Sequence, residues 1–423
     1  MTLASRNGRR DSLVLEGRVV APAQGIDECL RVTVADGVIA AIEPAPASEL
    51  VVAPAFVDPH VHLRTPGRED EETLRSGTEA AAAGGYCAIL AMPNTDPVVD
   101  SASVLRGLVS LAREEAVVPT GFMVAISKGQ AGDELTEMVE LAGAGAAAFT
   151  DDGRPVASAA LLRHALRYSG PTGLPLALHC EEPSLSRGGH AHEGAVSAEL
   201  GLGPYPSAAE SVMVERDLAL AALEERRVHL MHVSAAESVA AIDRALAAGV
   251  PATAEVTPHH LVLTDGAVRS LDANVKMNPP LRAERDREAL RDALRRGVIS
   301  CIATDHAPHA RHEKEVPFEE APFGVTGLET AFASLYTHLV LPGELELETL
   351  LERMSVGPAR AFGLPEPRIE VGARANVAVL DLRAEWEVTA DGFRSRSANS
   401  WLLGKQLTGR VVQTVADGRV VHG

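Results

Sequence analysis

The 423-residue sequence predicts an α/β protein built on a (β/α)8 TIM barrel, and three observations support this fold class. Between about residues 51 and 305, short apolar runs alternate with helix-like stretches rich in Ala, Leu, Glu and Arg. There are eight such apolar runs, which equals the number of strands in a (β/α)8 barrel. The Gly-rich phosphate fingerprint of a doubly wound open sheet is missing after the first run. The predicted barrel strands are residues 51–57, 86–92, 121–126, 146–149, 174–178, 228–233, 251–256 and 298–303.

The two ends of the chain predict a second, smaller unit. Residues 13–20, 30–41, 375–382 and 409–421 are strand-like segments punctuated by Gly, Asp and Pro. Each end is too short to fold alone, so we expect one small β-sandwich-like domain formed by both termini. The expected division assigns residues 1–50 plus 366–423 to this composite β domain and residues 51–365 to the barrel.

Composition narrows the classes of function. The formal net charge is -19 and no basic stretch stands out, so neither a nucleic acid nor an anionic membrane is an expected partner. No apolar run approaches the ~20 residues that span a bilayer, and residues 1–11 lack the hydrophobic region of a signal peptide. The four cysteines show no paired spacing, which suits free thiols in a reducing compartment. We therefore expect a cytoplasmic protein.

Polar side chains collect at the C-terminal ends of the predicted strands, where a TIM barrel carries its active site. His60 and His62 lie two apart at the end of the first strand, so they share a face and can hold one divalent metal. Any one such residue could be an ordinary core or capping residue, but several at corresponding strand ends predict a two-metal site. The set comprises His60, His62, His179, His232, Asp305 and one of Asp151 and Asp152.

Strand parity separates the ligand candidates from their neighbours. His232 shares a face with Leu230, whereas His229 lies on the opposite face and is expected to pack between barrel and helices. A second His-x-His pair, His190 and His192, falls in a predicted loop where no strand aligns the two rings. We treat that pair as a minor candidate.

Each residue type at these strand ends has a chemical reason. Neutral imidazoles suit zinc, and a carboxylate can bridge two divalent cations. Two such metals can share a hydroxide and polarise a carbonyl, while a nearby carboxylate moves the proton. Arg64 offers a planar fork for a substrate carboxylate. The sequence therefore predicts hydrolysis of an amide or similar bond in a small anionic molecule.

These motifs resemble the amidohydrolase superfamily and, within it, the dihydroorotases, along almost the whole chain. Met-Pro-Asn-Thr at residues 92–95 and Asn-Pro-Pro-Leu-Arg at residues 278–282 are more specific to the dihydroorotases than His-x-His is. The resemblance rests on residues 58–64, 92–95, 149–153, 232–234, 277–282 and 303–309.

The resemblance implies two divalent metal ions, for which Zn²⁺ is the natural expectation. It implies that His60, His62 and Asp305 bind the more buried ion, and that His179 and His232 bind the second.

In most members of the superfamily a carbamylated lysine at the end of the fourth strand bridges the metals. This chain has no lysine there, and its acidic pair is similar to that of a bacterial dihydroorotase branch with an aspartate bridge. The bridge is therefore assigned to Asp152, with Asp151 as the alternative.

The reaction implied is reversible hydrolysis of (S)-dihydroorotate to N-carbamoyl-L-aspartate by a metal-bound hydroxide, in pyrimidine biosynthesis. Asp305 would be the catalytic residue that takes the hydroxide proton and passes it to the departing nitrogen. Arg64, Asn94 and His309 would hold the substrate carboxylate. The whole implied substrate set is His62, Arg64, Asn94, Asn278, His309, Phe323 and Gly324.

Several alternatives stay open. A hydantoinase or allantoinase would open a related cyclic ureide, but those enzymes normally carry the bridging lysine. A non-catalytic partner of aspartate transcarbamoylase characteristically loses metal ligands, and all six positions are intact here. A complex with the transcarbamoylase and a homodimer are expectations from the family. Residues 310–323, between the eighth strand and its helix, are a candidate mobile lid or an ordinary surface loop.

Overall fold

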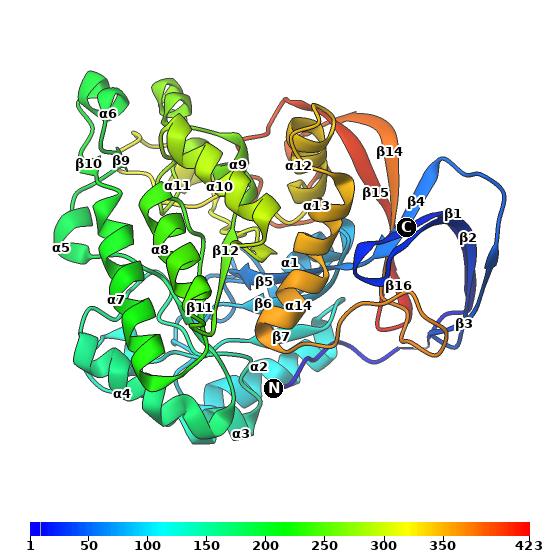
Figure 1. The fold of residues 1–423 in the computed structure, drawn as a ribbon, viewed down its shortest axis with the longest axis horizontal. Coiled ribbons are helices and arrows are strands. Elements are labelled where there is room, and N and C mark those ends of the chain that lie inside the picture. Colours follow the sequence, from blue (N-terminus) through cyan, green and yellow to red (C-terminus); the bar gives the residue numbers. More distant parts are fainter. Residues whose placement is uncertain (9) are drawn as a thin grey trace.

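Two regions make up the computed structural model, which describes residues 1–8 and 10–423. Figure 1 shows a barrel wrapped by helices and, beside it, a curled sheet to which both the first and the last strands of the chain contribute. Within the described residues, no helix is both long and apolar enough to cross a membrane.

The barrel is a closed ring of parallel strands. Three strands pair in the order β5-β6-β7 and four in the order β13-β12-β11-β8. Isolated parallel bridges join these sheets, because Phe149 pairs with both Val124 and Leu176, and Val61 pairs with His306. The segment around Phe149 thus takes the fourth strand position. The named strands are β5 (Phe56–Val61), β6 (Tyr86–Ala91), β7 (Thr120–Phe122), β8 (Leu176–Leu178), β11 (Val228–Leu230), β12 (Ala252–Val256) and β13 (Cys301–Ile302).

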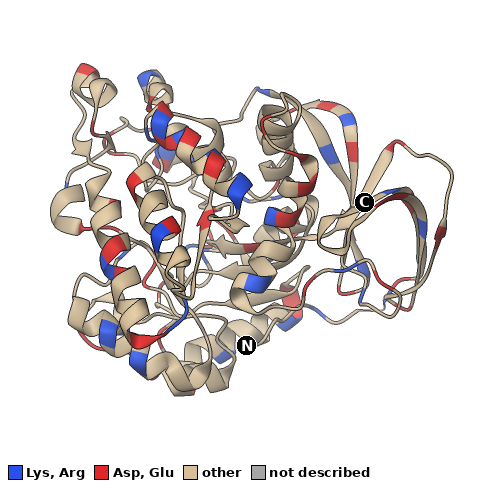
Figure 2. Ribbon diagram, viewed as in Figure 1, with Lys and Arg blue, Asp and Glu red and all other residues tan. Residues whose placement is uncertain are grey.

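Amphipathic helices cover the outside of the ring. In α10, Leu290, Ala293 and Leu294 face inward, while Glu284 in the first turn and Arg296 in the last turn complement the helix dipole. Figure 2 shows charges of both signs distributed along the helices. The covering helices are α1 (Leu74–Ala83), α2 (Ala102–Glu115), α3 (Met138–Ala144), α4 (Ala159–Ser169), α7 (Ala208–Glu224), α8 (Ala236–Ala247), α10 (Glu284–Arg296), α12 (Ala331–Leu335), α13 (Leu347–Met354) and α14 (Val356–Phe362).

Short elements interrupt the loops between these helices and strands. They are α5 (Pro183–Ser186), β9 (Ala191–His192), α6 (Ala195–Leu200), β10 (Pro204–Tyr205), α9 (Pro258–Val262) and α11 (Arg311–Lys314).

The second region is a seven-stranded sheet in the order β16-β15-β14-β4-β1-β2-β3. Two of its hairpins close on Asp-Gly pairs with positive φ, Asp36-Gly37 and Asp417-Gly418, as two-residue turns between twisted strands require. Val19, Val52 and Val377 belong to its own buried cluster. The strands are β1 (Leu13–Ala21), β2 (Ile26–Ala35), β3 (Val38–Pro44), β4 (Leu50–Pro54), β14 (Val377–Glu387), β15 (Gln406–Ala416) and β16 (Arg419–His422).

Three strand predictions are wrong because each joins parts of two strands. Residues 51–57 do not form one barrel strand, because β4 pairs with β1 and β14 in the terminal sheet and the barrel begins only at β5. Residues 51–54 of β4 and all of β5 are buried, so together they look like a single apolar run. Residues 30–41 and 409–421 likewise each contain parts of two strands, separated by the turns at Asp36-Gly37 and Asp417-Gly418. The division of the chain at residue 50 stays a prediction, and β4 crosses that boundary.

Candidate metal and substrate site

A cavity of about 180 Å³ opens at the C-terminal ends of the barrel strands. Every site residue predicted from the sequence lines it except His60, which is fully buried next to it. The lining consists of His62, Arg64, Asn94, Asp152, Gly153, His179, His232, Asn278, Asp305, Ala307, His309, Phe323 and Gly324. A larger cavity of about 240 Å³, between α12 and the β14–β15 region, shares none of these residues.

One side of the cavity, here named the histidine wall, consists of His60, His62, Asp152, His179, His232 and Asp305. Nε2 of His60 lies 3.4 Å from Oδ1 of Asp305 and 3.6 Å from Oδ1 of Asp152. Nε2 of His62 lies 3.1 Å from Oδ1 of Asp305 and 3.5 Å from Oδ2 of Asp152. The strand-end His-x-His pair therefore faces two carboxylates.

The other two histidines of the wall approach Asp152 from β8 and β11. Nδ1 of His179 lies 2.8 Å from Nε2 of His232 and 3.5 Å from Oδ1 of Asp152. Nε2 of His232 lies 3.8 Å from the same oxygen. Asp152 is thus the one carboxylate of the wall that lies within 4 Å of all four imidazoles.

Asp151 has a different role in the structure. Its carboxylate accepts hydrogen bonds from the backbone N–H groups of Ile126 at 2.8 Å and Ser127 at 3.1 Å, and from the Ser127 hydroxyl. These contacts turn Asp151 away from the histidines and toward the segment after β7. Of the two aspartates, Asp152 is the one that faces the histidine wall.

The histidine wall fits a bound cation. Nε2 of His60 is buried without a hydrogen-bond partner among the described residues. Burial alone would lower the pKa of His60, yet the surrounding carboxylates, Glu255 foremost, raise it well above its usual value. Burial would also raise the pKa of Asp152, but the imidazoles, His60 foremost, hold it well below its usual range. Buried carboxylates and imidazoles in this arrangement are compatible with a binuclear metal site.

Glu255 on β12 supports this wall and was not predicted from the sequence. Its Oε1 lies 2.6 Å from Nδ1 of His60, and its Oε2 lies 2.9 Å from Nε2 of His229. Burial would raise the pKa of Glu255, but these two imidazoles lower it to about 2. A carboxylate on the second ring nitrogen fixes the orientation of a ligating histidine. A fully buried charge inside an apolar strand was the available signal.

His229 packs between the barrel and a helix, as strand parity predicts. Its ring packs against Phe362 of α14 with centroids 4.7 Å apart, and its Nδ1 lies 2.8 Å from the Thr253 hydroxyl. The pair His190 and His192 joins no cluster of metal-ligand type within residues 1–8 and 10–423.

A second part of the cavity lining, here named the arginine wall, consists of Arg64, Asn94 and His309. Nη2 of Arg64 lies 3.4 Å from Nε2 of His309. The Asn94 amide joins the two walls, because its Oδ1 lies 3.0 Å from Nδ1 of His62 and its Nδ2 donates to Asp152 at 3.2 Å. A guanidinium and an imidazole at the mouth of the cavity suit a carboxylate ligand.

Backbone conformation helps to direct three of the lining side chains into the cavity. Arg64, His232 and Asp305 all have positive φ, at 56°, 33° and 48°. Non-glycine residues adopt such angles at a cost of order 1–3 kcal/mol, and they cluster at functional sites. The chain therefore leaves the extended conformation where these residues enter the cavity, and this redirects their side chains.

The third part of the lining comes from loops after α9 and β13. Nδ2 of Asn278 donates to Glu181 at 3.0 Å, whereas Oδ1 of Asn278 is buried without a partner among the described residues. Gly324 has φ 121°, and a Cβ there would lie 2.7 Å from that of Ala307. Only glycine fits this close approach of the backbone to the cavity.

Residues 310–323 contain α11 and pack through two lysines, the buried Lys276 and the partly buried Lys314. Nζ of Lys276 donates to three backbone carbonyls, those of Phe318, Glu319 and Ala321, at 2.7–2.9 Å. Nζ of Lys314 donates to Pro322 at 2.8 Å and to Ala273 at 3.1 Å. These bonds fasten the segment against the barrel; its movement as a lid stays a prediction.

Comparisons with known proteins agree with the geometry. The sequence model of the amidohydrolase family matches residues 51–421. The chain is 46% identical to a dihydroorotase of Anaeromyxobacter sp. (strain K), over 97% of this chain and 98% of that one. It is 44% identical to a dihydroorotase of Citrifermentans bemidjiense, over 97% and 99% of the two chains.

Among solved structures, the L-hydantoinase (dihydropyrimidinase) from Arthrobacter aurescens is similar, with a TM-score of 0.86 and 26% identity. The similarity covers 97% of this chain and 95% of that one. A D-hydantoinase at 22% identity and a TM-score of 0.84 shares the fold. The chain belongs to the amidohydrolase family, and within it to the dihydroorotases.

Proposed function

We propose that this chain catalyses the reversible hydrolysis of (S)-dihydroorotate to N-carbamoyl-L-aspartate, a step of pyrimidine synthesis. One observation carries the proposal: residues of the histidine wall and of the arginine wall line the same small cavity. A hydrolytic centre beside a guanidinium suits a cyclic amide that bears a carboxylate. The name borne by the similar proteins from Anaeromyxobacter and Citrifermentans supports the same substrate.

Two divalent ions, which we propose to be Zn²⁺, suit the donors of the histidine wall. His60, His62 and Asp305 would hold one ion, His179 and His232 the other, and Asp152 would contact both. When bound, such ions supply a water of lowered pKa and polarise the scissile carbonyl. Nε2 of His60, which has no hydrogen-bond partner in the part of the chain that the structure describes, supports this assignment.

The arginine wall would bind the carboxylate on the substrate ring. Arg64 and Asn94 line the cavity, so the guanidinium and the amide can both donate to carboxylate oxygens. Oδ1 of Asn278 is buried and unpartnered among the described residues, so it can accept from a ring N–H. Backbone groups at Phe323 and Gly324 complete the contact with the ring amide edge.

Asp305 would move the proton during ring opening. Water adds OH to the carbonyl carbon beside the methylene group, and the bond from that carbon to the ring nitrogen breaks. Asp305 lines the cavity and lies between His60 and His62, so it can accept the proton of the attacking water. It then donates this proton to the departing nitrogen, and ring closure follows the reverse course.

Purified protein tests the proposal directly. We expect loss of dihydroorotate ring absorbance with wild-type protein, abolition of this activity by a chelator, and its recovery with Zn²⁺. The Asp305→Ala variant should show no turnover above background. Turnover of hydantoin without turnover of dihydroorotate would assign the site to the hydantoinases instead, in line with the similar fold of the Arthrobacter enzyme.

We also propose a cytoplasmic location and a homodimer, with association with aspartate transcarbamoylase as a further proposal. Free cysteines, three of them buried, support a reducing compartment. Light scattering on the purified protein, alone and mixed with the transcarbamoylase, tests both assemblies. A monomer mass in every mixture would contradict them.

A further inference from the structure

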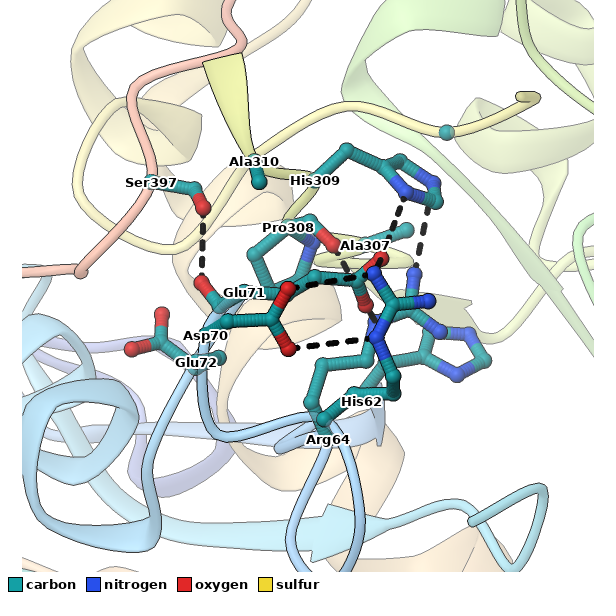
Figure 3. Close-up of polar contacts among 12 residues, drawn as sticks. His62, Arg64, Asp70, Glu71, Glu72, Ala307, Pro308, His309, Ala310 and Ser397 are labelled. Atoms are coloured by element: carbon teal, nitrogen blue, oxygen red, sulfur yellow. Dashed lines mark hydrogen bonds and ion pairs between the residues drawn. The ribbon is translucent and has the colours of Figure 1, made fainter. Parts of the chain in front are cut away.

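The loop after β5 places a buried carboxylate, Glu71, directly behind the arginine wall. Its side chain is only 3% exposed although it lies in a strongly acidic stretch, residues 69–72. Figure 3 shows this carboxylate beside Arg64 and His309. An acidic stretch is usually a solvated surface, so the burial of one member calls for a reason.

Glu71 occupies the inner edge of the Arg64 guanidinium. Its Oε2 lies 2.9 Å from Nε of Arg64, and the carbonyl of Pro308 lies 3.1 Å from the same nitrogen. None of the described residues accepts a hydrogen bond from Nη1. Nη1 is therefore left for a ligand in the cavity, which Arg64 also lines.

The same carboxylate orients the second member of the wall. Oε1 of Glu71 lies 3.2 Å from Nδ1 of His309, while Nε2 of His309 lies 2.8 Å from the carbonyl of Phe323. A neutral imidazole donates from one ring nitrogen only, and the tautomer with its proton on Nδ1 lets His309 donate to Glu71. One side chain thus sets the orientation of both Arg64 and His309.

Glu71 is itself held in place from two directions. Nη2 of Arg68 lies 2.9 Å from its Oε1. The Ser397 hydroxyl donates to its backbone carbonyl at 2.6 Å, from the segment between β14 and β15. The carboxylate therefore has a defined position before any ligand arrives.

We propose that Glu71 is a positioning residue that gives this cavity its selectivity for a substrate bearing a carboxylate. The inference rests on the proposed function, because it concerns the same cavity. Glu71 keeps Arg64 from turning toward the carboxylates of the histidine wall and keeps His309 from rotating. Binding a carboxylate then requires no reorganisation of the wall.

Two inhibitors of dihydroorotate hydrolysis test this role. N-carbamoyl-L-aspartate carries the carboxylate that the arginine wall would bind, and N-carbamoyl-β-alanine is the same molecule without it. For Glu71→Gln we expect the KM of dihydroorotate and the inhibition constant of N-carbamoyl-L-aspartate to rise about tenfold or more, since charge-assisted hydrogen bonds are lost. The inhibition constant of N-carbamoyl-β-alanine should change less than about twofold, and kcat should change less than KM.

Asp70→Asn is the matched control. Asp70 is the adjacent carboxylate, its side chain is 54% exposed, and among the described residues its carboxylate pairs only with Arg68. This variant should keep the wild-type constants for both inhibitors. Thermal melting of each variant shows whether its fold is retained.

Other outcomes separate the inference from the proposed function. An equal loss of affinity for both inhibitors, or unchanged constants in Glu71→Gln, would overturn the positioning role while leaving the dihydroorotase assignment intact. Failure of wild-type protein to hydrolyse dihydroorotate would instead overturn the proposed function itself.

Discussion

The two walls of the cavity are built in different ways. Residues of the histidine wall follow the strands of the ring, so the barrel itself brings them together. Arg64 and His309 of the arginine wall lie in loops and are contacted by Glu71, and the segment between β14 and β15 contacts His309 and Glu71. We propose that the difference separates two tasks: the barrel would position the groups for bond cleavage, and the loops would position the groups for recognition. Substitutions in the two walls should therefore affect kcat and KM differently.

The largest expected effect is on the chemical step and comes from the histidine wall. Asp305→Asn keeps the size of the side chain but removes the carboxylate that we propose moves the proton. We expect kcat to fall by about 10²–10⁴, the range ascribed to general acid–base catalysis, with a smaller change in KM. Steady-state kinetics at saturating dihydroorotate measure it. A kcat within tenfold of wild type would mean that another group carries the proton.

A smaller effect is expected from the residue behind that wall. Glu255→Gln removes the charge from the carboxyl that contacts Nδ1 of His60. Partners of this kind typically change metal affinity by about 10–100-fold. Competition with a chromophoric chelator measures the affinity, and Glu28→Gln, on the exposed face of the terminal sheet, is the control. Unchanged affinity would show that Glu255 serves the fold alone.

The arginine wall should respond mainly in KM. Arg64→Lys retains a positive charge but loses the planar fork. Because hydrogen bonds to charged groups contribute about 1.5–3 kcal/mol, we expect KM for dihydroorotate to rise at least tenfold. A fall in kcat as large as the rise in KM would place Arg64 in the chemical step and would remove the proposed division between the walls.

The smallest expected effect on activity comes from the segment between β14 and β15. The Asn399 side-chain amide donates to the backbone carbonyls of Ala307 at 3.1 Å and Gly324 at 3.2 Å. Its oxygen accepts from the backbone N–H of His309 at 3.0 Å. Asn399→Ala leaves these buried groups unpaired, which costs about 1–3 kcal/mol of unfolding free energy. We expect a lower midpoint of denaturant unfolding and only a few-fold rise in KM. An unchanged midpoint would show that water replaces the amide.

The histidine wall could be predicted from the sequence because a strand has a period of two and a barrel collects strand ends. These two rules are sufficient to assign His60, His62 and His232 to the end of the barrel that carries the cavity. They could not distinguish Asp151 from Asp152, because parity fails once the backbone leaves the strand. The contacts of Asp151 with Ile126 and Ser127 are tertiary, and no local pattern encodes them.

The support for the arginine wall was not predictable in the same way. Glu71 lies in a stretch whose composition resembles a solvated surface, and its partner His309 lies far along the chain. The separation of β4 from β5 was also hidden, because both strands are buried and so share an apolar composition. In each case the local sequence does not show which distant segment packs against the residue or strand.

One measurement tests the central claim that this cavity pairs a hydrolytic centre with a carboxylate-binding wall. It is the ratio of kcat/KM for (S)-dihydroorotate to kcat/KM for 5,6-dihydrouracil, which has the same ring without the carboxylate. Wild-type protein should prefer dihydroorotate by about 100-fold or more, as expected when a charged group is left unpaired by the smaller substrate. In Arg64→Lys this ratio should fall. Equal or better turnover of 5,6-dihydrouracil by wild-type protein would contradict the assignment of both the wall and the substrate.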